Sequence, residues 1–260
     1  DTITTARWLD PNEFTIDRKL GYISLLRKLQ NDEALAVSFE YTFQGRNYKV
    51  GELTEDYATV SEDEVIFLKL LRPRKINIDD PQGDRIPTWE LMMKNIYALN
   101  ATNVSQDGFE LRVIYRDDLS GIDNPQLQFG AVASTIPLIQ LLGLDRLNPN
   151  NDPQPDGNFD FVEDITIQTN NGLIIFPFLE PFNTPLDNAF LPNEDAFREK
   201  FVYNELYNQT RINAQLVSDK NKYVISGSFQ SGSSNEIIIP GFNIAEGSVR
   251  VFAGGSPLIE

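Results

Sequence analysis

The segment EALAVSFEYTFQGRNYKVGEL, residues 33–53, decides the fold class of this 260-residue chain. Val, Phe and Tyr are dense in residues 33–43, which is the composition of a strand. The next four residues, Gln44-Gly45-Arg46-Asn47, have turn chemistry, and residues 48–53 return with further strand-forming side chains. This pattern predicts an antiparallel β-hairpin.

Other parts of the chain also read as short strands. Residues 20–26 and 65–71 are predicted strands, although Ser61 and Glu64 also offer a capping box that would start a helix before the second of them. Residues 222–230 alternate apolar and polar side chains, which is the period of a half-buried strand. We therefore expect a mainly β fold of the α+β class, with antiparallel, sandwich-like sheets and a few inserted helices.

Three segments predict helices. The first is residues 88–99, with Thr88 as N-cap, and the second is residues 136–142. The third begins after the cap Asn193. The apolar faces are Leu91, Met92, Ile96 and Leu99 in the first helix, and Phe197, Phe201, Val202 and Leu206 in the third.

The chain divides best into a β-rich part, residues 1–116, and an acidic β/α part, residues 117–260. The border is placed at residues 117–124, and the whole chain as a single domain is the alternative. Residues 79–85 and 187–193 are the predicted loops.

Composition limits the classes of function. The hydrophobic content of 41% and the 17 Phe, 9 Tyr and 2 Trp are typical of a folded protein.

There is no Cys and no His, which excludes Ser-His-Asp and Cys-His catalysis and the usual zinc sites. The net charge of −16, without a basic stripe, argues against nucleic acid as a partner. No apolar run approaches the ~18 residues of a membrane-spanning helix, so we expect a water-soluble mature chain or excised fragment without direct membrane insertion.

The sequence DPQPDGNFDFVE, residues 152–163, has the oxygen spacing of a calcium loop. With Gly157 at the sixth place, the sharp turn, oxygen-bearing residues occupy places one, three, five, seven, nine and twelve. The six candidate ligands are Asp152, Gln154, Asp156, Asn158, Asp160 and Glu163. Asn158 would contribute its backbone carbonyl, and Gln154 stands where Asp or Asn is usual. The loop therefore predicts a structural Ca²⁺ site, with an ordinary solvated turn as the alternative.

Most of the negative charge lies around this loop. Residues 117–195 contain thirteen Asp and Glu side chains against one base, Arg146, a net charge of −12. A bound divalent cation would relieve the mutual repulsion of these carboxylates.

Seven strings in order resemble one family. They are LGYISL (20–25), LAVSFEYTFQG (35–45), YKVGEL (48–53), WELMMKNIYAL (89–99), LDRLNPNNDPQPDGNFDFVE (144–163), IIFPFLEPF (174–182) and SVRVFAGG (248–255). Together they are similar to the SprA (Sov) family, the outer-membrane translocon of the type IX secretion system of gliding bacteria. The strings around Trp89 and residues 152–163 are long enough to be specific, whereas residues 79–85 and 187–193 differ from the family.

The resemblance implies a fragment of a much larger protein that forms a wide barrel in the outer membrane. The fragment would be a periplasmic or extracellular portion with a structural role and no catalytic residue. Its partners would be other parts of the translocon barrel, the associated outer-membrane secretion subunits and secreted cargo.

Two other functions stay open. A secreted carbohydrate-binding or adhesive β-sandwich would present an exposed row of aromatic residues such as Trp8, Tyr57 or Trp89. A glycosidase would use paired acids such as Asp117 with Asp118 or Glu163 with Asp164. Adjacent residues on a strand point to opposite faces, so these pairs are weak candidates and we expect no enzyme.

Overall fold

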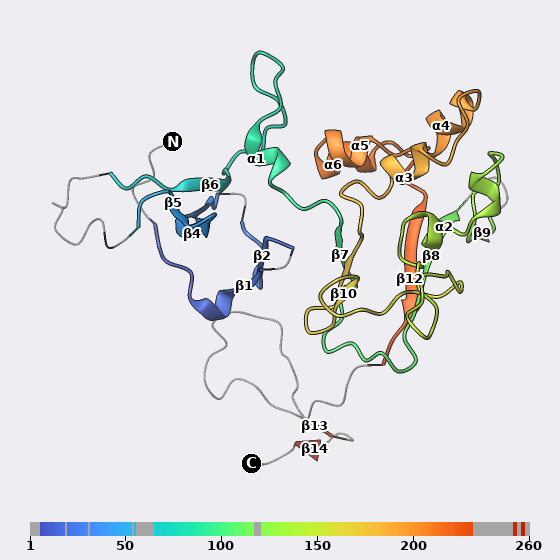
Figure 1. Cartoon of the computed structure of the whole chain (residues 1–260), viewed down its shortest axis with the longest axis horizontal. Helices are drawn as coiled ribbons and strands as arrows, with labels where there is room; N and C mark the ends of the chain where they lie inside the picture. The colour runs from blue at the N-terminus through green and yellow to red at the C-terminus, as the bar shows by residue number, and fades with distance from the viewer. Residues whose placement is uncertain are drawn as a thin grey trace.

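The computed structural model describes residues 6–18, 20–30, 32–53, 55, 65–116 and 121–230, together with the backbone of 252–253 and 256–257. The fold is mainly β with short helices, and every ladder between its named strands is antiparallel (Figure 1), as the sequence predicts.

The strands are β1 (Phe14–Asp17), β2 (Tyr22–Leu25), β3 (Leu35–Val37), β4 (Phe39–Phe43), β5 (Arg46–Val50), β6 (Lys69–Arg72), β7 (Ile96–Ala98), β8 (Glu110–Arg116), β9 (Asp123–Asn124), β10 (Ile167–Gln168), β11 (Leu173–Ile175), β12 (Tyr223–Ser228), β13 (Phe252–Ala253) and β14 (Ser256–Pro257). The helices are α1 (Pro87–Glu90), α2 (Leu138–Leu141), α3 (Thr184–Asp187), α4 (Asp195–Phe201), α5 (Glu205–Asn208) and α6 (Arg211–Gln215), with 3₁₀ turns η1 (Pro11–Glu13) and η3 (Ala133–Thr135).

The first six strands form three two-stranded sheets, β1-β2, β3-β6 and β4-β5, on one side of the view in Figure 1. The predicted hairpin of residues 33–53 is confirmed in β4 and β5, where Phe43 pairs with Arg46. The turn is tighter than predicted, because only Gln44 (φ 49°) and Gly45 (φ 74°) lie between the strands. Two positive φ values are the signature of a two-residue hairpin turn. The strand predicted at residues 20–26 is present as β2.

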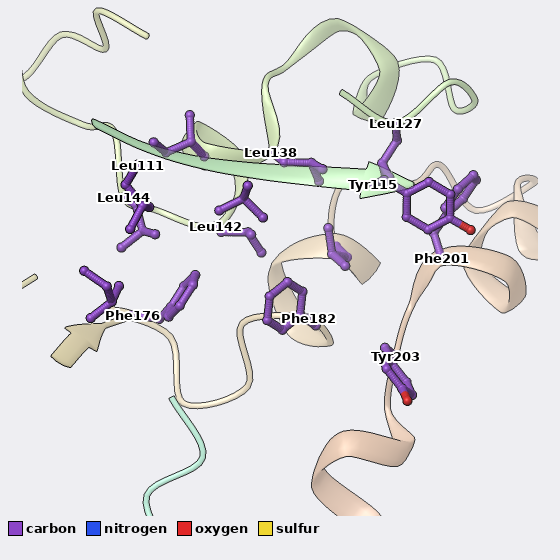
Figure 2. Packing of buried hydrophobic residues seen from close by; sticks show 14 of the residues in the cluster. Leu111, Tyr115, Leu127, Leu138, Leu142, Leu144, Phe176, Phe182, Phe201 and Tyr203 are labelled. Atoms are coloured by element: carbon purple, nitrogen blue, oxygen red, sulfur yellow. The ribbon is translucent and has the colours of Figure 1, made fainter. Parts of the chain in front are cut away.

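Two three-stranded sheets, β10-β11-β7 and β12-β8-β9, contribute to one hydrophobic cluster. Figure 2 shows buried side chains along β8, with Leu111 near one end, Tyr115 beside Phe201 near the other, and Leu142, Phe176 and Phe182 in the layer below the strand in this view. These six side chains are at most 5% exposed. Burial of this much apolar surface is the main stabilising contribution to the fold.

The expected border at residues 117–124 follows β8 directly and includes β9 of the same sheet. Arg116 of β8 pairs with Asp123 of β9, and β8 also pairs with β12 along its length. The hydrophobic cluster likewise draws residues from both sides of this border.

The helix predicted at residues 88–99 is wrong. Helix α1 covers only Pro87–Glu90, its N-cap is Ile86 and not Thr88, and residues 96–98 form β7. The predicted apolar face does not exist, since Leu91 and Met92 are 49% and 44% exposed. Strand pairing decides the conformation: β7 pairs with β11, and the backbone N–H of Phe176 donates to the carbonyl of Asn95 at 2.9 Å. Tertiary pairing here overrides helix propensity.

The helix predicted after Asn193 is present but shorter. Helix α4 begins at Asp195 and ends at Phe201, because Val202 is extended at ψ 116°. The chain then turns inward, and the backbone N–H of Tyr203 donates to the carbonyl of Phe182 at 2.8 Å. Leu206 therefore belongs to the separate helix α5.

The other predicted elements among the described residues are present with different bounds. Helix α2 occupies part of residues 136–142 and β12 part of 222–230, whereas β6 overlaps the predicted strand 65–71 only at residues 69–71 and ends at Arg72. Residues 79–85 are a loop, and residues 188–193 form turns after α3. The possible capping box of Ser61 and Glu64 lies outside the described residues. Among the residues that the structure describes, no helix has the length and apolar character needed to cross a membrane.

Candidate functional site: the acidic loop 152–163

The candidate site follows helix α2, where the apolar run of residues 141–144 ends in an acid. Leu144 is completely buried, and Asp145 is only 1% exposed. The backbone turns between Leu142 and Leu144 in a conformation that requires glycine at position 143. Its φ is +79°, and a Cβ there would lie 2.7 Å from the side chain of Pro177. The chain therefore carries a carboxylate into the protein interior seven positions before the predicted calcium loop begins.

The Asp145 carboxylate is held by the turn of that loop. Its Oδ1 accepts from the backbone N–H of Asp156 at 2.9 Å, and its Oδ2 accepts from the backbone N–H of Gly157 at 3.0 Å. Gly157 occupies the sharp turn with φ +88°, which is a conformation that favours glycine. Both oxygens of the buried carboxylate are thus satisfied by backbone amides.

Asp160 makes the reverse connection. Its carboxylate accepts from the backbone N–H groups of Arg146 at 2.6 Å and Leu147 at 3.1 Å. Its own backbone N–H donates to the carbonyl of Leu144 at 2.8 Å. Residues 144–147 and 156–160 are therefore joined by hydrogen bonds that run in both directions.

The other candidate carboxylates have separate partners. The side chain of Asp156 accepts from the backbone N–H of Asn158 at 2.9 Å, and that of Asp152 accepts from the side chain of Asn148 at 3.3 Å. Glu163 accepts from the backbone N–H of Thr169 at 3.1 Å.

The four carboxylates among the six predicted ligands, Asp152, Asp156, Asp160 and Glu163, accept hydrogen bonds from different groups of the protein. Ca²⁺ needs six to eight oxygens gathered around one point. Across residues 121–230 and the other described stretches, no group of three or more acidic side chains is arranged to hold a metal. Calcium binding by residues 152–163 stays a prediction from the sequence.

Burial affects the ionisation of Asp145. Its pKa is raised, first because desolvation disfavours the charged carboxylate. The amide hydrogen bonds from Asp156 and Gly157 act in the opposite direction, and the negative charges of Asp156 and Asp160 add to the increase. Amide donation thus only partly offsets the cost of placing a carboxylate here.

Asp145 is the residue of this site that the calcium pattern does not include. The pattern starts at Asp152 and counts oxygens along the loop, so an acid seven positions earlier falls outside it. The sequence signal for Asp145 is its position directly after the apolar run of residues 141–144. An acid next to such a run is carried toward the interior, and a buried carboxylate needs hydrogen-bond partners.

Of the residues proposed for other functions, the structure describes Trp8, Trp89, Glu163 and Asp164. Trp89 is buried, and its indole N–H donates to the carbonyl of Tyr207 at 2.9 Å, whereas Trp8 is 75% exposed. Glu163 is bonded to Thr169, as described above, and the adjacent Asp164 has a φ of +60°. Tyr57, Asp117 and Asp118 lie outside the described residues.

A separate hollow of about 410 Å³ lies beside helices α3, α4 and α5. Its two cations are both paired, since Arg198 contacts Asp187 at 2.6 Å and Asp195 at 2.7 Å, and Lys220 contacts Glu205 at 2.9 Å. These ion pairs neutralise the basic groups, so the hollow has no positive charge to attract an anion.

No protein-family model matches the chain, and no curated protein sequence matches it.

Proposed function

We propose that this chain is a noncatalytic module of the outer-membrane translocon of a type IX secretion system, where it supports protein export and gliding motility. The observation that carries the proposal is the order and spacing of the seven strings similar to the SprA (Sov) family. Its position would be periplasmic or extracellular, attached to the outer membrane through the rest of the translocon.

The places of these strings in the fold support a structural role. Residues 174–182 supply Phe176 and Phe182 to the hydrophobic cluster, and their rings lie 5.8 Å apart. Trp89 is anchored on Tyr207 across 118 positions of sequence. Residues 144–163 contain the hydrogen bonds by which the carboxylates of Asp145 and Asp160 join residues 144–147 to residues 156–160. Residues in three of the seven strings therefore make buried or long-range contacts within the module. Such contacts are expected of a structural part of a larger assembly.

The partners of the module would be the rest of the translocon, its associated outer-membrane subunits and exported cargo. The test is to place an affinity tag in the loop of residues 79–85 of the parent protein and to purify it from its native membranes. Outer-membrane secretion components should co-purify, and deletion of the module should reduce the export of secreted proteins. Purification without such components, together with unchanged export, would contradict the proposal.

A second function is favoured by one observation, the aromatic face of the β4-β5 hairpin. Tyr41 pairs with Tyr48 across the strands, and their rings are stacked 5.2 Å apart. Phe39 and Phe43 continue the same face, and all four side chains are between 39% and 57% exposed. Stacked aromatic rings are the surface that a carbohydrate-binding or adhesive module uses. Glycan-array binding that is lost in Tyr41→Ala, and kept in the opposite-face variant Thr42→Ala, would establish this alternative.

A further inference from the structure

We propose that Asp145 and Asp160 form a reciprocal latch that fixes residues 144–160 without a cation. The inference does not rest on the proposed function, because it concerns only the hydrogen bonds of this segment. It assigns to Asp145 the role that the sequence pattern gives to a calcium ion.

The first half of the latch is the Asp145 carboxylate. It reaches from the end of the apolar run into the turn and binds the amides of two consecutive residues, Asp156 and Gly157. The side chain is 1% exposed, so these amides take the place of the water that would otherwise solvate it. Two amide donors on one carboxylate hold the turn in one orientation.

The second half is the Asp160 carboxylate, which binds the amides of Arg146 and Leu147 on the opposite segment. The bond from the Asp160 N–H to the Leu144 carbonyl closes the same connection through the backbone. Each of the four carboxylate oxygens therefore accepts one amide of the other segment.

This exchange explains how an acidic loop can be ordered without a metal. A calcium ion orders such a loop by drawing carboxylates toward one positive centre. In the latch, four backbone N–H groups donate to two carboxylates, two to each. The acidic side chains therefore do not have to lie around one common point. Asp152, which the pattern makes the first calcium ligand, contributes nothing to the latch and provides a matched control.

The test is amide hydrogen exchange, read by mass spectrometry at single-residue level, on the full chain in EGTA and in millimolar calcium. In the wild type, the amides of Arg146, Leu147, Asp156 and Gly157 should be equally protected in both solutions. Protection that appears only with calcium would overturn the proposal.

Variants then separate the two halves of the latch. Asp145→Asn removes one acceptor oxygen and should speed exchange by about tenfold or more at Asp156 or Gly157. Asp160→Asn should do the same at Arg146 or Leu147, and Asp152→Asn should leave all four amides unchanged. Unchanged exchange in both Asp145→Asn and Asp160→Asn would overturn the proposal. The wild-type comparison in EGTA and calcium needs no variant, so a variant that fails to fold does not affect it.

Discussion

Replacement of Phe176 by Ala should remove a large part of the stability of the fold. Phe176 follows β11 directly and is completely buried. Its ring lies 5.3 Å from that of Tyr97 and 5.8 Å from that of Phe182. Truncation of a buried Phe to Ala costs about 3–5 kcal/mol, because the cavity remains after the transfer free energy is lost. The upper part of this range applies here, since each lost aromatic contact is worth about 0.5–1.5 kcal/mol beyond burial.

The assay is urea unfolding monitored by tryptophan fluorescence. Trp89 is 4% exposed and reports on the interior, whereas Trp8 is 75% exposed and can be replaced by Phe to remove its background. The unfolding midpoint of Phe176→Ala should fall by the amount that corresponds to about 3–5 kcal/mol.

Two control variants test whether the loss of stability in Phe176→Ala comes from the buried ring. Leu179→Ala lies three residues further on and is 71% exposed, so it should change stability by no more than about 0.5 kcal/mol. Phe176→Leu keeps most of the volume and should cost less than Phe176→Ala. A loss below about 1 kcal/mol in Phe176→Ala would refute the reasoning, because it would mean that the Phe176 ring is not packed in the hydrophobic cluster.

Three further perturbations have defined outcomes. Gly172→Ala should destabilise the fold by at least about 2 kcal/mol in urea unfolding, because its φ is +57° and the new Cβ would lie 2.1 Å from the Ala101 carbonyl oxygen. Gly157→Ala should cost only about 1–2 kcal/mol, since its φ of +88° is strained for Ala but nothing lies within 4 Å; equal losses in the two variants would contradict this contrast. Burial raises the pKa of Tyr97 to about 12, so the unfolded chain ionises first as pH rises from about 10. The contribution of Tyr97 to the free energy of unfolding is fully present below pH 10. It is lost as the pH rises toward 12, by up to about 3 kcal/mol. In Tyr97→Phe, the free energy of unfolding measured in urea should fall less between pH 9 and pH 11.5 than in the wild type. An unaltered pH dependence would contradict the link between Tyr97 and stability at high pH.

Local signals in the sequence identify the hairpin well. Val, Phe and Tyr alternate with polar residues in 39–50 and Gly45 tolerates a positive φ, so the two strands follow from neighbouring residues, although the turn is two residues shorter than predicted. Strand β12 also lies where the sequence predicts it, in residues 222–230, but its first three residues are half-buried and its last three are exposed, so burial does not alternate along it.

Long-range pairing explains where the sequence prediction fails. Residues 88–99 have a helical apolar period, but β7 forms there because β11, more than 70 residues later, offers a partner strand. The Trp89 indole also needs the carbonyl of Tyr207, which no local pattern contains. A conformation that depends on contacts this distant is invisible to a periodicity argument.

The sequence predicts the turn of the acidic loop, whereas the hydrogen bonds of Asp145 cannot be predicted from the spacing of its oxygens. The turn at Gly157 follows from the sequence, as glycine is the residue that tolerates its φ. The role of Asp145 depends on burial and on the approach of the amides of Asp156 and Gly157, and neither property is encoded in an oxygen count along residues 152–163.

Differential scanning calorimetry of the full chain in EGTA and in saturating calcium tests the account most directly. A calcium site at ~100-fold saturation would add about 2.7 kcal/mol to the folded state and raise the melting midpoint by several degrees. The latch of Asp145 and Asp160 predicts the same midpoint in both solutions. A midpoint that rises with calcium in the wild type but not in Asp152→Asn would contradict the account and would establish the metal site.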